Sequence, residues 1–240
     1  MRDDVTFVLI SLEDGERFLK NNINLSNINF QIFGINGKDL KAGEYFKTMF
    51  SNEHVLLSPS EIGNRLSHIN ALKSFLSSSS NFCCVFEDDV TVNLNTLSNL
   101  IESPNLKSFD YIHLGGLEGL RIEKVFKSKK NTNSQNAISK IELNSLWRAC
   151  GYMINKKAAQ EIINAQEKEV LVSDNWPVFF RNKELNYGFC KCVEHPEILE
   201  NSLIEREREA LDEFRKKNYV KNFGRIFNTL LAIIYSWVKK

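Results

Sequence analysis

The chain has 240 residues, which is enough for one α/β domain with a substantial core and a tail. Its formal net charge is +1, from 31 basic and 30 acidic residues, and this balance argues against a nucleic acid as its general partner. The chain enters an apolar run almost at once without the features of a secretory signal, and its 5 cysteines form no disulfide framework. These features predict a cytoplasmic protein with reduced thiols.

Strands and helices are predicted to alternate from the start of the chain. Residues 6–12 form a β-rich apolar run, after which a glycine turn leads into a helical stretch carrying Arg17. Residues 30–35 read as a second strand, which Asn36-Gly37 stops. Two strands joined through a helix imply a parallel crossover. No G-x-G-x-x-G motif or P-loop follows the first strand, which argues against the common dinucleotide-binding fold and against a nucleoside triphosphatase.

The next helix has the clearest start signal in the sequence. Ser58-Pro59-Ser60-Glu61 combines a capping box with proline at the first helical position, and the helix is expected to run to about residue 75 or 77. Glu61, Arg65 and His68 then share a face beside the apolar stripe. These side chains are either a surface ion pair and a boundary histidine, or part of a polar site.

An acidic turn follows the third predicted strand. Residues 82–86 are an unbroken apolar run, typical of a strand buried on both faces, and Glu87, Asp88 and Asp89 follow directly. In extended chain Glu87 and Asp89 point the same way, so their oxygens are predicted to converge on Mg²⁺ or Mn²⁺ shared with substrate phosphates. The alternative is a solvated acidic turn.

The second half of the chain continues the alternation. A carboxylate, Asp174, ends an apolar segment there, where it is either a functional group or the cap of a short helix. Cys190 and Cys192 could form half of a zinc site, but no second Cys/His pair has the required spacing. The predicted elements are a helix at 94–101, a strand at 110–114, a mobile loop at 127–140, a strand at 147–154 and a helix at 156–163.

These motifs together resemble glycosyltransferase family 25, which contains lipopolysaccharide and lipooligosaccharide glycosyltransferases. The resemblance covers about residues 5 to 204, and its most specific parts are the E-I-G-x-x-L-S-H helix and the E-D-D strand end. Asn64 stands where the family often has cysteine, and residues 117–146 match weakly. The segments that carry the resemblance are 7–12, 34–37, 61–68, 85–90, 151–154 with 158–159, Asp174, and 202–204.

The resemblance implies a GT-A-like, Rossmann-like α/β fold with a mostly parallel sheet flanked by helices in residues 1–204, and a helical tail in 205–240. It also implies a metal-dependent hexosyltransferase that moves galactose from UDP-galactose, with inversion and a β-linkage, onto a lipooligosaccharide or lipopolysaccharide acceptor. The alternative is a non-catalytic sugar-nucleotide or polysaccharide-binding protein that retains the fold.

The same resemblance assigns roles to the candidate residues. Glu87 and Asp89 would hold the cation, which stabilises the departing diphosphate as a Lewis acid. Asp174 is the candidate base for the acceptor hydroxyl, with Glu118 and Glu61 as alternatives. The catalytic candidates are Asp174, His68 and Arg65. The donor-binding candidates are Ser11, Leu12, Arg17, Asn36, Gly37, Glu61, Arg65, His68, Asp88 and Gly151.

The tail changes character at Tyr219. Residues 205–217 read as a charged, solvated helix, whereas 219–240 carry apolar residues at helical spacing with basic residues beside them. The apolar part is shorter than the ~20 residues that span a bilayer. We therefore expect a basic amphipathic helix that lies on the cytoplasmic face of the inner membrane, beside a lipid-linked acceptor. The alternative is a helix docked on the domain or in a dimer.

Overall fold

The computed structural model describes residues 4–12, 15–50, 57–127 and 136–196, together with residues 207 and 211. Within these residues one mixed sheet has the strand order β2-β1-β3-β7-β5-β8-β4, with β6 paired to β8. The strands are β1 (Val5–Ile10), β2 (Phe30–Phe33), β3 (Phe82–Glu87), β4 (Thr91–Val92), β5 (Tyr111–Gly115), β6 (Asn136–Ile138), β7 (Gly151–Asn155) and β8 (Tyr187–Glu194).

Most of these strands run in the same direction. β1, β2 and β3 are mutually parallel, β7 runs against both β3 and β5, and β8 is parallel to β5. The short strands β4 and β6 run against β8. The predicted α/β class and mostly parallel sheet are therefore confirmed, with β7 as an antiparallel strand in the centre.

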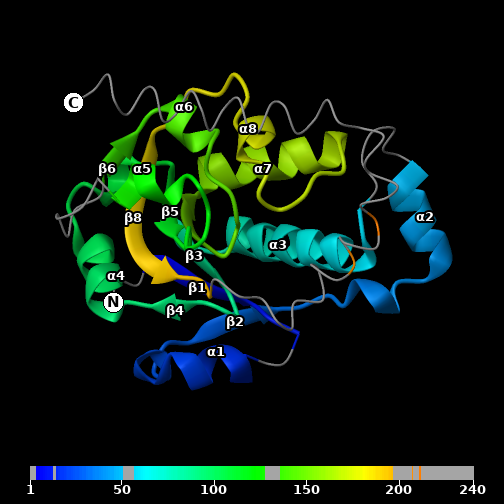
Figure 1. Cartoon of the computed structure of the whole chain (residues 1–240), viewed down its shortest axis with the longest axis horizontal. Helices are drawn as coiled ribbons and strands as arrows, with labels where there is room; N and C mark the ends of the chain where they lie inside the picture. Colours follow the sequence, from blue (N-terminus) through cyan, green and yellow to red (C-terminus); the bar gives the residue numbers. More distant parts are fainter. Residues whose placement is uncertain are drawn as a thin grey trace.

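Helices cover both faces of the sheet (Figure 1). Side chains alternate along each central strand, so Val8 of β1 packs in one core and Leu9 in the other. One core contains residues of α3, α7 and α8, and the second contains residues of α1 and α4. The helices are α1 (Glu16–Asn21), α2 (Ala42–Phe50), α3 (Pro59–Ser77), α4 (Leu94–Glu102), α5 (Glu123–Lys127), α6 (Lys140–Leu143), α7 (Lys156–Lys168) and α8 (Trp176–Phe179), with 3₁₀ turns η1 (Ile23–Leu25), η2 (Gly37–Asp39) and η3 (Leu106–Ser108).

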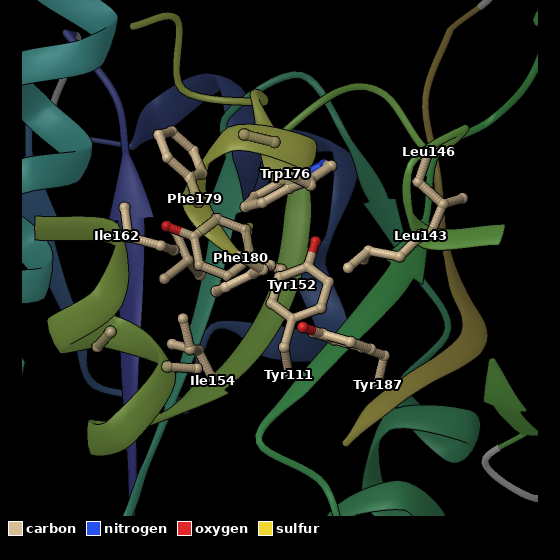
Figure 2. Close-up of a cluster of buried hydrophobic side chains, with 14 of the residues drawn as sticks. Tyr111, Leu143, Leu146, Tyr152, Ile154, Ile162, Trp176, Phe179, Phe180 and Tyr187 are labelled. Carbon is tan, nitrogen blue, oxygen red and sulfur yellow. The ribbon is translucent and has the colours of Figure 1, made fainter. Parts of the chain in front are cut away.

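An aromatic cluster dominates the core beneath α3, α7 and α8 (Figure 2). The ring centroids of Tyr111 and Trp176 lie 4.8 Å apart, and those of Tyr152 and Trp176 lie 5.5 Å apart. Aromatic pairs at these separations stabilise a core beyond the area that they bury. The cluster therefore fixes the start of α8 against β5 and β7.

The helix predicted from residue 58 is confirmed. Ser58 Oγ accepts a hydrogen bond from Glu61 N at 3.1 Å, and Glu61 Oε2 accepts one from Ser58 N at 2.8 Å. The capping box thus begins α3 at Pro59, and the helix ends at Ser77. The parallel pairing of β1 with β2 and the helices predicted at 94–101 and 156–163 are also confirmed.

Several expectations about the second half are wrong. The strand predicted from residue 147 begins only at Gly151, because Arg148 has a left-handed φ of 69° that interrupts extended chain. Asp174 does not cap α8, whose N-cap is Asn175 and has no side-chain cap bond. The loop expected at 127–140 contains β6 and the start of α6, while its residues 128–135 lie outside the described residues.

The predicted tail at 205–240 lies outside the described residues, apart from Glu207 and Leu211. Within the part of the chain that the structure describes, no helix is long and apolar enough to cross a membrane.

Candidate active site

Five strands bring polar residues to one edge of the sheet. The carboxyl ends of β1 and β3 lie together, since Ile10 pairs with Glu87. β7 starts at the same edge because it is antiparallel, and Phe86 pairs with Gly151. β5 and β8 end there as well. The carboxyl edge of an open α/β sheet is where such folds bind ligands.

The acidic turn lies at this edge, and its three carboxylates have different partners. β3 ends at Glu87, and Asp88 and Asp89 form a turn, so the extended geometry assumed from the sequence does not reach Asp89. Glu87 and Asp89 therefore do not lie side by side as alternate residues of one strand. Each of the three side chains contacts a different part of the edge.

Glu87 is held by α3 and β7. Its Oε1 accepts a hydrogen bond from Asn64 Nδ2 at 2.9 Å and lies 3.2 Å from His68 Nε2. The other ring nitrogen, His68 Nδ1, lies 3.0 Å from the hydroxyl of Tyr152. Because a carboxylate only accepts, a neutral His68 donates from Nε2 to Glu87 and accepts at Nδ1 from Tyr152. His68 is 4% exposed, and its contacts orient the Glu87 carboxylate.

Asp88 faces the end of β1 and helix α1. Ser11 Oγ donates to its Oδ2 at 2.9 Å, and Arg17 Nη1 lies 3.6 Å from its Oδ1. Burial raises the pKa of Asp88 above its ordinary value, against the opposing effects of Ser11 and Arg17. Two predicted donor-binding residues, Ser11 and Arg17, thus contact a third, Asp88.

Asp89 faces the end of β8. Its Oδ2 lies 3.3 Å from His195 Nε2, while its Oδ1 is buried and has no hydrogen-bond partner within the described residues. Burial opposes ionisation of Asp89, but the hydrogen bond and charge of His195 outweigh it and hold the pKa of this carboxyl below its usual value. Sequence analysis missed His195, because β8, the strand that ends directly before it, was not predicted.

The chemistry of the side chains around the acidic turn shows whether they could bind a cation. In the described part of the chain no group of three or more His, Cys, Asp and Glu side chains is arranged to hold a metal ion. Mg²⁺ and Mn²⁺ sites of phosphate-transferring enzymes need fewer, because one or two carboxylates share the ion with phosphate oxygens and water. A buried carboxylate oxygen without a partner, as in Asp89, fits such a site.

Asp174 lies beside the start of β7. Its Oδ2 accepts a hydrogen bond from the backbone N–H of Arg148 at 3.1 Å. The Arg148 guanidinium in turn donates to the carbonyls of Gly116 and Glu118, at 2.9 Å each. Arg148 therefore ties the candidate base to the end of β5.

Asn64 connects the Asp174 loop to the acidic turn. Its amide donates to Glu87, and its Oδ1 accepts a hydrogen bond from the hydroxyl of Ser173. Asn64 was singled out only as a departure from the family pattern, and one helical turn separates it from His68 on α3.

Some predicted site residues have other contacts. Arg65 donates from Nε and Nη2 to the side chain and carbonyl of Gln166, at 2.6 and 2.8 Å, so it ties α3 to α7 and does not reach the acidic turn. The Glu61 carboxylate belongs to the capping box. Glu118, an alternative base, accepts from His195 N and pairs with Lys191 at 3.0 Å.

The remaining donor-binding candidates lie after β1, after β2 and at the start of β7. Leu12 is exposed after β1. The Asn36 side chain accepts a hydrogen bond from Lys38 N, and Gly37 is packed on α3. Gly151 is close to β8, since a Cβ there would lie 2.9 Å from a methyl group of Val193.

The fold and site define an α/β protein with an acidic, polar site at the carboxyl edge of its sheet. Residues 5–176 match the family model described as glycosyltransferase family 25 (LPS biosynthesis protein). This match spans well over half of the chain, and the chain belongs to that family. No curated protein is significantly similar to the chain. A solved structure described as the crystal structure of A197 from STIV is 13% identical, with 80% of this chain and 83% of that chain covered and a TM-score of 0.43.

Proposed function

We propose that this glycosyltransferase moves galactose from UDP-galactose, with inversion and in a β-linkage, onto a lipooligosaccharide or lipopolysaccharide acceptor, and that it requires Mn²⁺ or Mg²⁺. The family supports sugar transfer in lipopolysaccharide biosynthesis. The observation that supports the metal requirement is the buried Asp89 oxygen at the carboxyl edge of the sheet, which has no hydrogen-bond partner among the residues that the structure describes.

Asp89 and Glu87 are the residues that would hold the cation, and His195 Nε2, which lies 3.3 Å from Asp89 Oδ2, orients the Asp89 carboxylate. The cation, when bound, neutralises charge on the departing diphosphate. His68 and Asn64 fix the orientation of the Glu87 carboxylate before a donor binds. Such preorganisation avoids the cost of reorienting groups during the reaction.

The chain's own acid–base chemistry is assigned to Asp174. In this proposal the second oxygen of its carboxylate takes the proton of the acceptor hydroxyl. The acceptor oxygen then bonds to the anomeric carbon of the sugar, while the bond from that carbon to the nucleoside diphosphate breaks. The backbone N–H of Arg148 holds the other oxygen, which fixes the direction from which the base approaches. Arg17, whose side chain is 49% exposed beside Asp88, supplies a cation for the donor phosphates.

We also propose that residues 219–240 bind the cytoplasmic face of the inner membrane and bring the enzyme to a lipid-linked acceptor. The support is the sequence pattern, which combines apolar residues at helical spacing with flanking lysine and arginine.

A donor screen with matched variants tests the proposal. Transfer and hydrolysis of UDP-sugars are measured with Mn²⁺, with Mg²⁺ and with EDTA, and Mn²⁺ affinity is measured by calorimetry in the presence of UDP. Asp89→Asn and Glu87→Gln keep the shape of each side chain but remove the charge, so each should lower turnover by at least ~100-fold. Glu167→Gln is the control, because its exposed carboxylate lies on α7 beside Lys73.

Full activity in EDTA would reject the metal requirement. Tight binding of UDP-sugar with neither transfer nor hydrolysis would favour a binding protein that retains the fold.

A further inference from the structure

Most of the backbone N–H groups in the first turn of α3 have hydrogen-bond partners at the start of the helix. Pro59 has no N–H, Glu61 N donates to Ser58 Oγ, and Ile62 N donates to the Ser58 carbonyl. The N–H of Ser60 therefore needs a partner from outside the helix, because the first N–H groups of a helix have none within it.

That partner comes from the C-terminal part of the chain. Glu207 Oε2 accepts a hydrogen bond from Ser60 N at 2.9 Å across a separation of 147 residues. Its Oε1 lies 3.2 Å from Lys38 Nζ, in the η2 turn. The hydroxyl groups of Ser58 and Ser60 also favour its charged form. Burial opposes the charge on Glu207, but these donors outweigh it and lower the pKa of the carboxyl.

The two elements that Glu207 joins are already pressed together. A Cβ at Gly37 would lie 1.6 Å from the carbonyl oxygen of Pro59, and one at Gly63 would lie 2.4 Å from the carbonyl oxygen of Ile35. Ile35 N also donates to Ser67 Oγ at 2.8 Å. The η2 turn and the start of α3 therefore form one tightly packed junction.

This junction leads directly to the site. Asn36 and Gly37, two donor-binding candidates, lie at its η2 side. On its α3 side the same helix carries Asn64 and His68, which hold Glu87. A displacement of the first turn of α3 would therefore be passed to the acidic turn, since a helix moves as a rigid element.

We propose that Glu207 is a clasp and a positioning residue: it fastens the C-terminal segment to the η2–α3 junction and so holds the donor-binding side of the site in place. The effect on the nucleotide-sugar donor rests on the proposed function, whereas the attachment of Glu207 to the junction does not. It also extends the catalytic unit beyond residue 204, where the sequence places the end of the domain.

The attachment can be measured in the full-length protein without any activity. Glu207→Ala removes both contacts, Glu207→Gln removes the charge but keeps an acceptor for Ser60 N, and Lys38→Met removes the cation. Glu209→Gln is the control, because it removes the same charge as Glu207→Gln within the same run of alternating glutamate and arginine. The readouts are hydrogen exchange of the peptide containing Ser60 and the rate of trypsin cleavage at Arg206 and Arg208.

A charge-assisted hydrogen bond from a helix N-terminus to a carboxylate is stronger than a neutral one, so Glu207→Ala should speed exchange at Ser60 by ~10-fold. Cleavage beside residue 207 should accelerate by a similar factor. Glu207→Gln and Lys38→Met should show smaller increases, and Glu209→Gln should match the wild type. Unchanged exchange and cleavage in Glu207→Ala would overturn the clasp.

The positioning role has its own readout. Glu207→Ala should raise KM for the nucleotide sugar by ~5-fold and lower kcat by a smaller factor, because the variant loosens the donor side and leaves Asp174 in place. Faster exchange at Ser60 with an unchanged KM would overturn the positioning role. Absence of transfer by the wild type with every donor would count against the proposed function, whereas exchange and proteolysis would still decide the clasp.

Discussion

The hydroxyl of Tyr152 lies 3.0 Å from Nδ1 of His68, and the two rings are stacked with their centroids 5.8 Å apart. Tyr152 belongs to the aromatic core shown in Figure 2, where it contacts Trp176. Its hydroxyl thus connects the aromatic core to the polar site. Through His68 it determines which ring nitrogen faces Glu87.

Removal of this hydroxyl should affect activity more than stability. Tyr152→Phe leaves His68 Nδ1 without its donor, so the proton is no longer confined to the nitrogen that faces Glu87. We expect kcat to fall by ~10-fold and the free energy of unfolding to fall by ~1 kcal/mol. Steady-state kinetics and urea unfolding measure the two effects.

Tyr187→Phe is the matched control for this experiment. The Tyr187 hydroxyl is buried and has no hydrogen-bond partner within the described residues, so its loss should leave kcat unchanged. Equal losses of activity in the two variants would mean that the Tyr152 hydroxyl has no special role.

Two glycines should respond oppositely to the same substitution. A Cβ at Gly63 would lie 2.4 Å from the Ile35 carbonyl oxygen and 2.5 Å from Gly37 N. Gly63→Ala must therefore displace η2 from α3 and should lower the free energy of unfolding by about 2 kcal/mol. Gly43, in α2, has open space around its Cβ position, and Gly43→Ala should stabilise the helix by about 0.5 kcal/mol.

Thermal unfolding distinguishes the two glycine variants. A change of 1 kcal/mol moves Tm by about 2–4 °C in a chain of this length. Gly63→Ala should therefore melt several degrees below the wild type and Gly43→Ala slightly above it. A Gly63 variant with an unchanged Tm would show that the junction is not closely packed.

The stability of the protein should fall between neutral pH and about pH 4 through His113. This ring is fully buried, and Gly115 N donates to its Nδ1 while its Nε2 faces the carbonyls of Trp147 and Arg148. A proton on Nδ1 would meet the N–H of Gly115. Burial lowers the pKa of His113 to about 4 from an ordinary 6.5, against the raising effect of the two carbonyls.

The direction of this pH effect follows from the two pKa values. Because the pKa is lower in the folded state, the unfolded chain binds the proton more readily below pH 6.5, and stability is lost as the pH falls towards 4. The loss amounts to about 3 kcal/mol for this residue. NMR titration should show that His113 keeps its neutral form down to pH 5, and a ring that titrates near 6.5 would contradict the prediction.

Deletion of residues 219–240 should release the protein from anionic membranes. Each lysine or arginine near the surface contributes ~1 kcal/mol of attraction, and burial of the apolar residues adds to it. Transfer to a soluble acceptor should persist, because the deletion keeps Glu207 and every residue assigned to chemistry. Liposome co-sedimentation of the full-length and shortened proteins checks the prediction, and equal sedimentation would reject the anchor.

Local signals were sufficient for much of the fold. The capping box predicted the start of α3 to the residue, and the apolar run from Phe82 predicted the central strand β3. β8 was missed, although all but two of its eight residues are buried, because Gly188 and the interleaved lysine and glutamate obscure its apolar pattern. Its position is determined by pairing with β5, which lies far away in the sequence.

The gathering of acidic residues at this edge could be predicted from the sequence, but their contacts could not. Glu87, Asp88, Asp89 and Asp174 do reach one edge of the sheet, yet the turn after β3 gives each carboxylate its own partners, which residue alternation cannot show. Arg65 and Asn64 lie on opposite sides of His68 around α3, at about 60° and 40°. Sequence periodicity favoured Arg65 as a site residue. Because α7 packs against α3, Arg65 instead hydrogen bonds to Gln166, and Asn64 hydrogen bonds to Glu87.

The antiparallel direction of β7 has a consequence for how specificity can change. The chain leaves the sheet after Gly115 at the active edge, and it returns to that edge at Gly151. The intervening stretch therefore begins and ends beside the reacting groups, and its two ends are joined by Arg148 to the Gly116 carbonyl. Insertions at its exposed positions outside β6 cost little loop-closure entropy and leave the paired strands in register. In the proposed transfer reaction, this stretch can take up changes that suit a different acceptor while the acidic turn remains where it is.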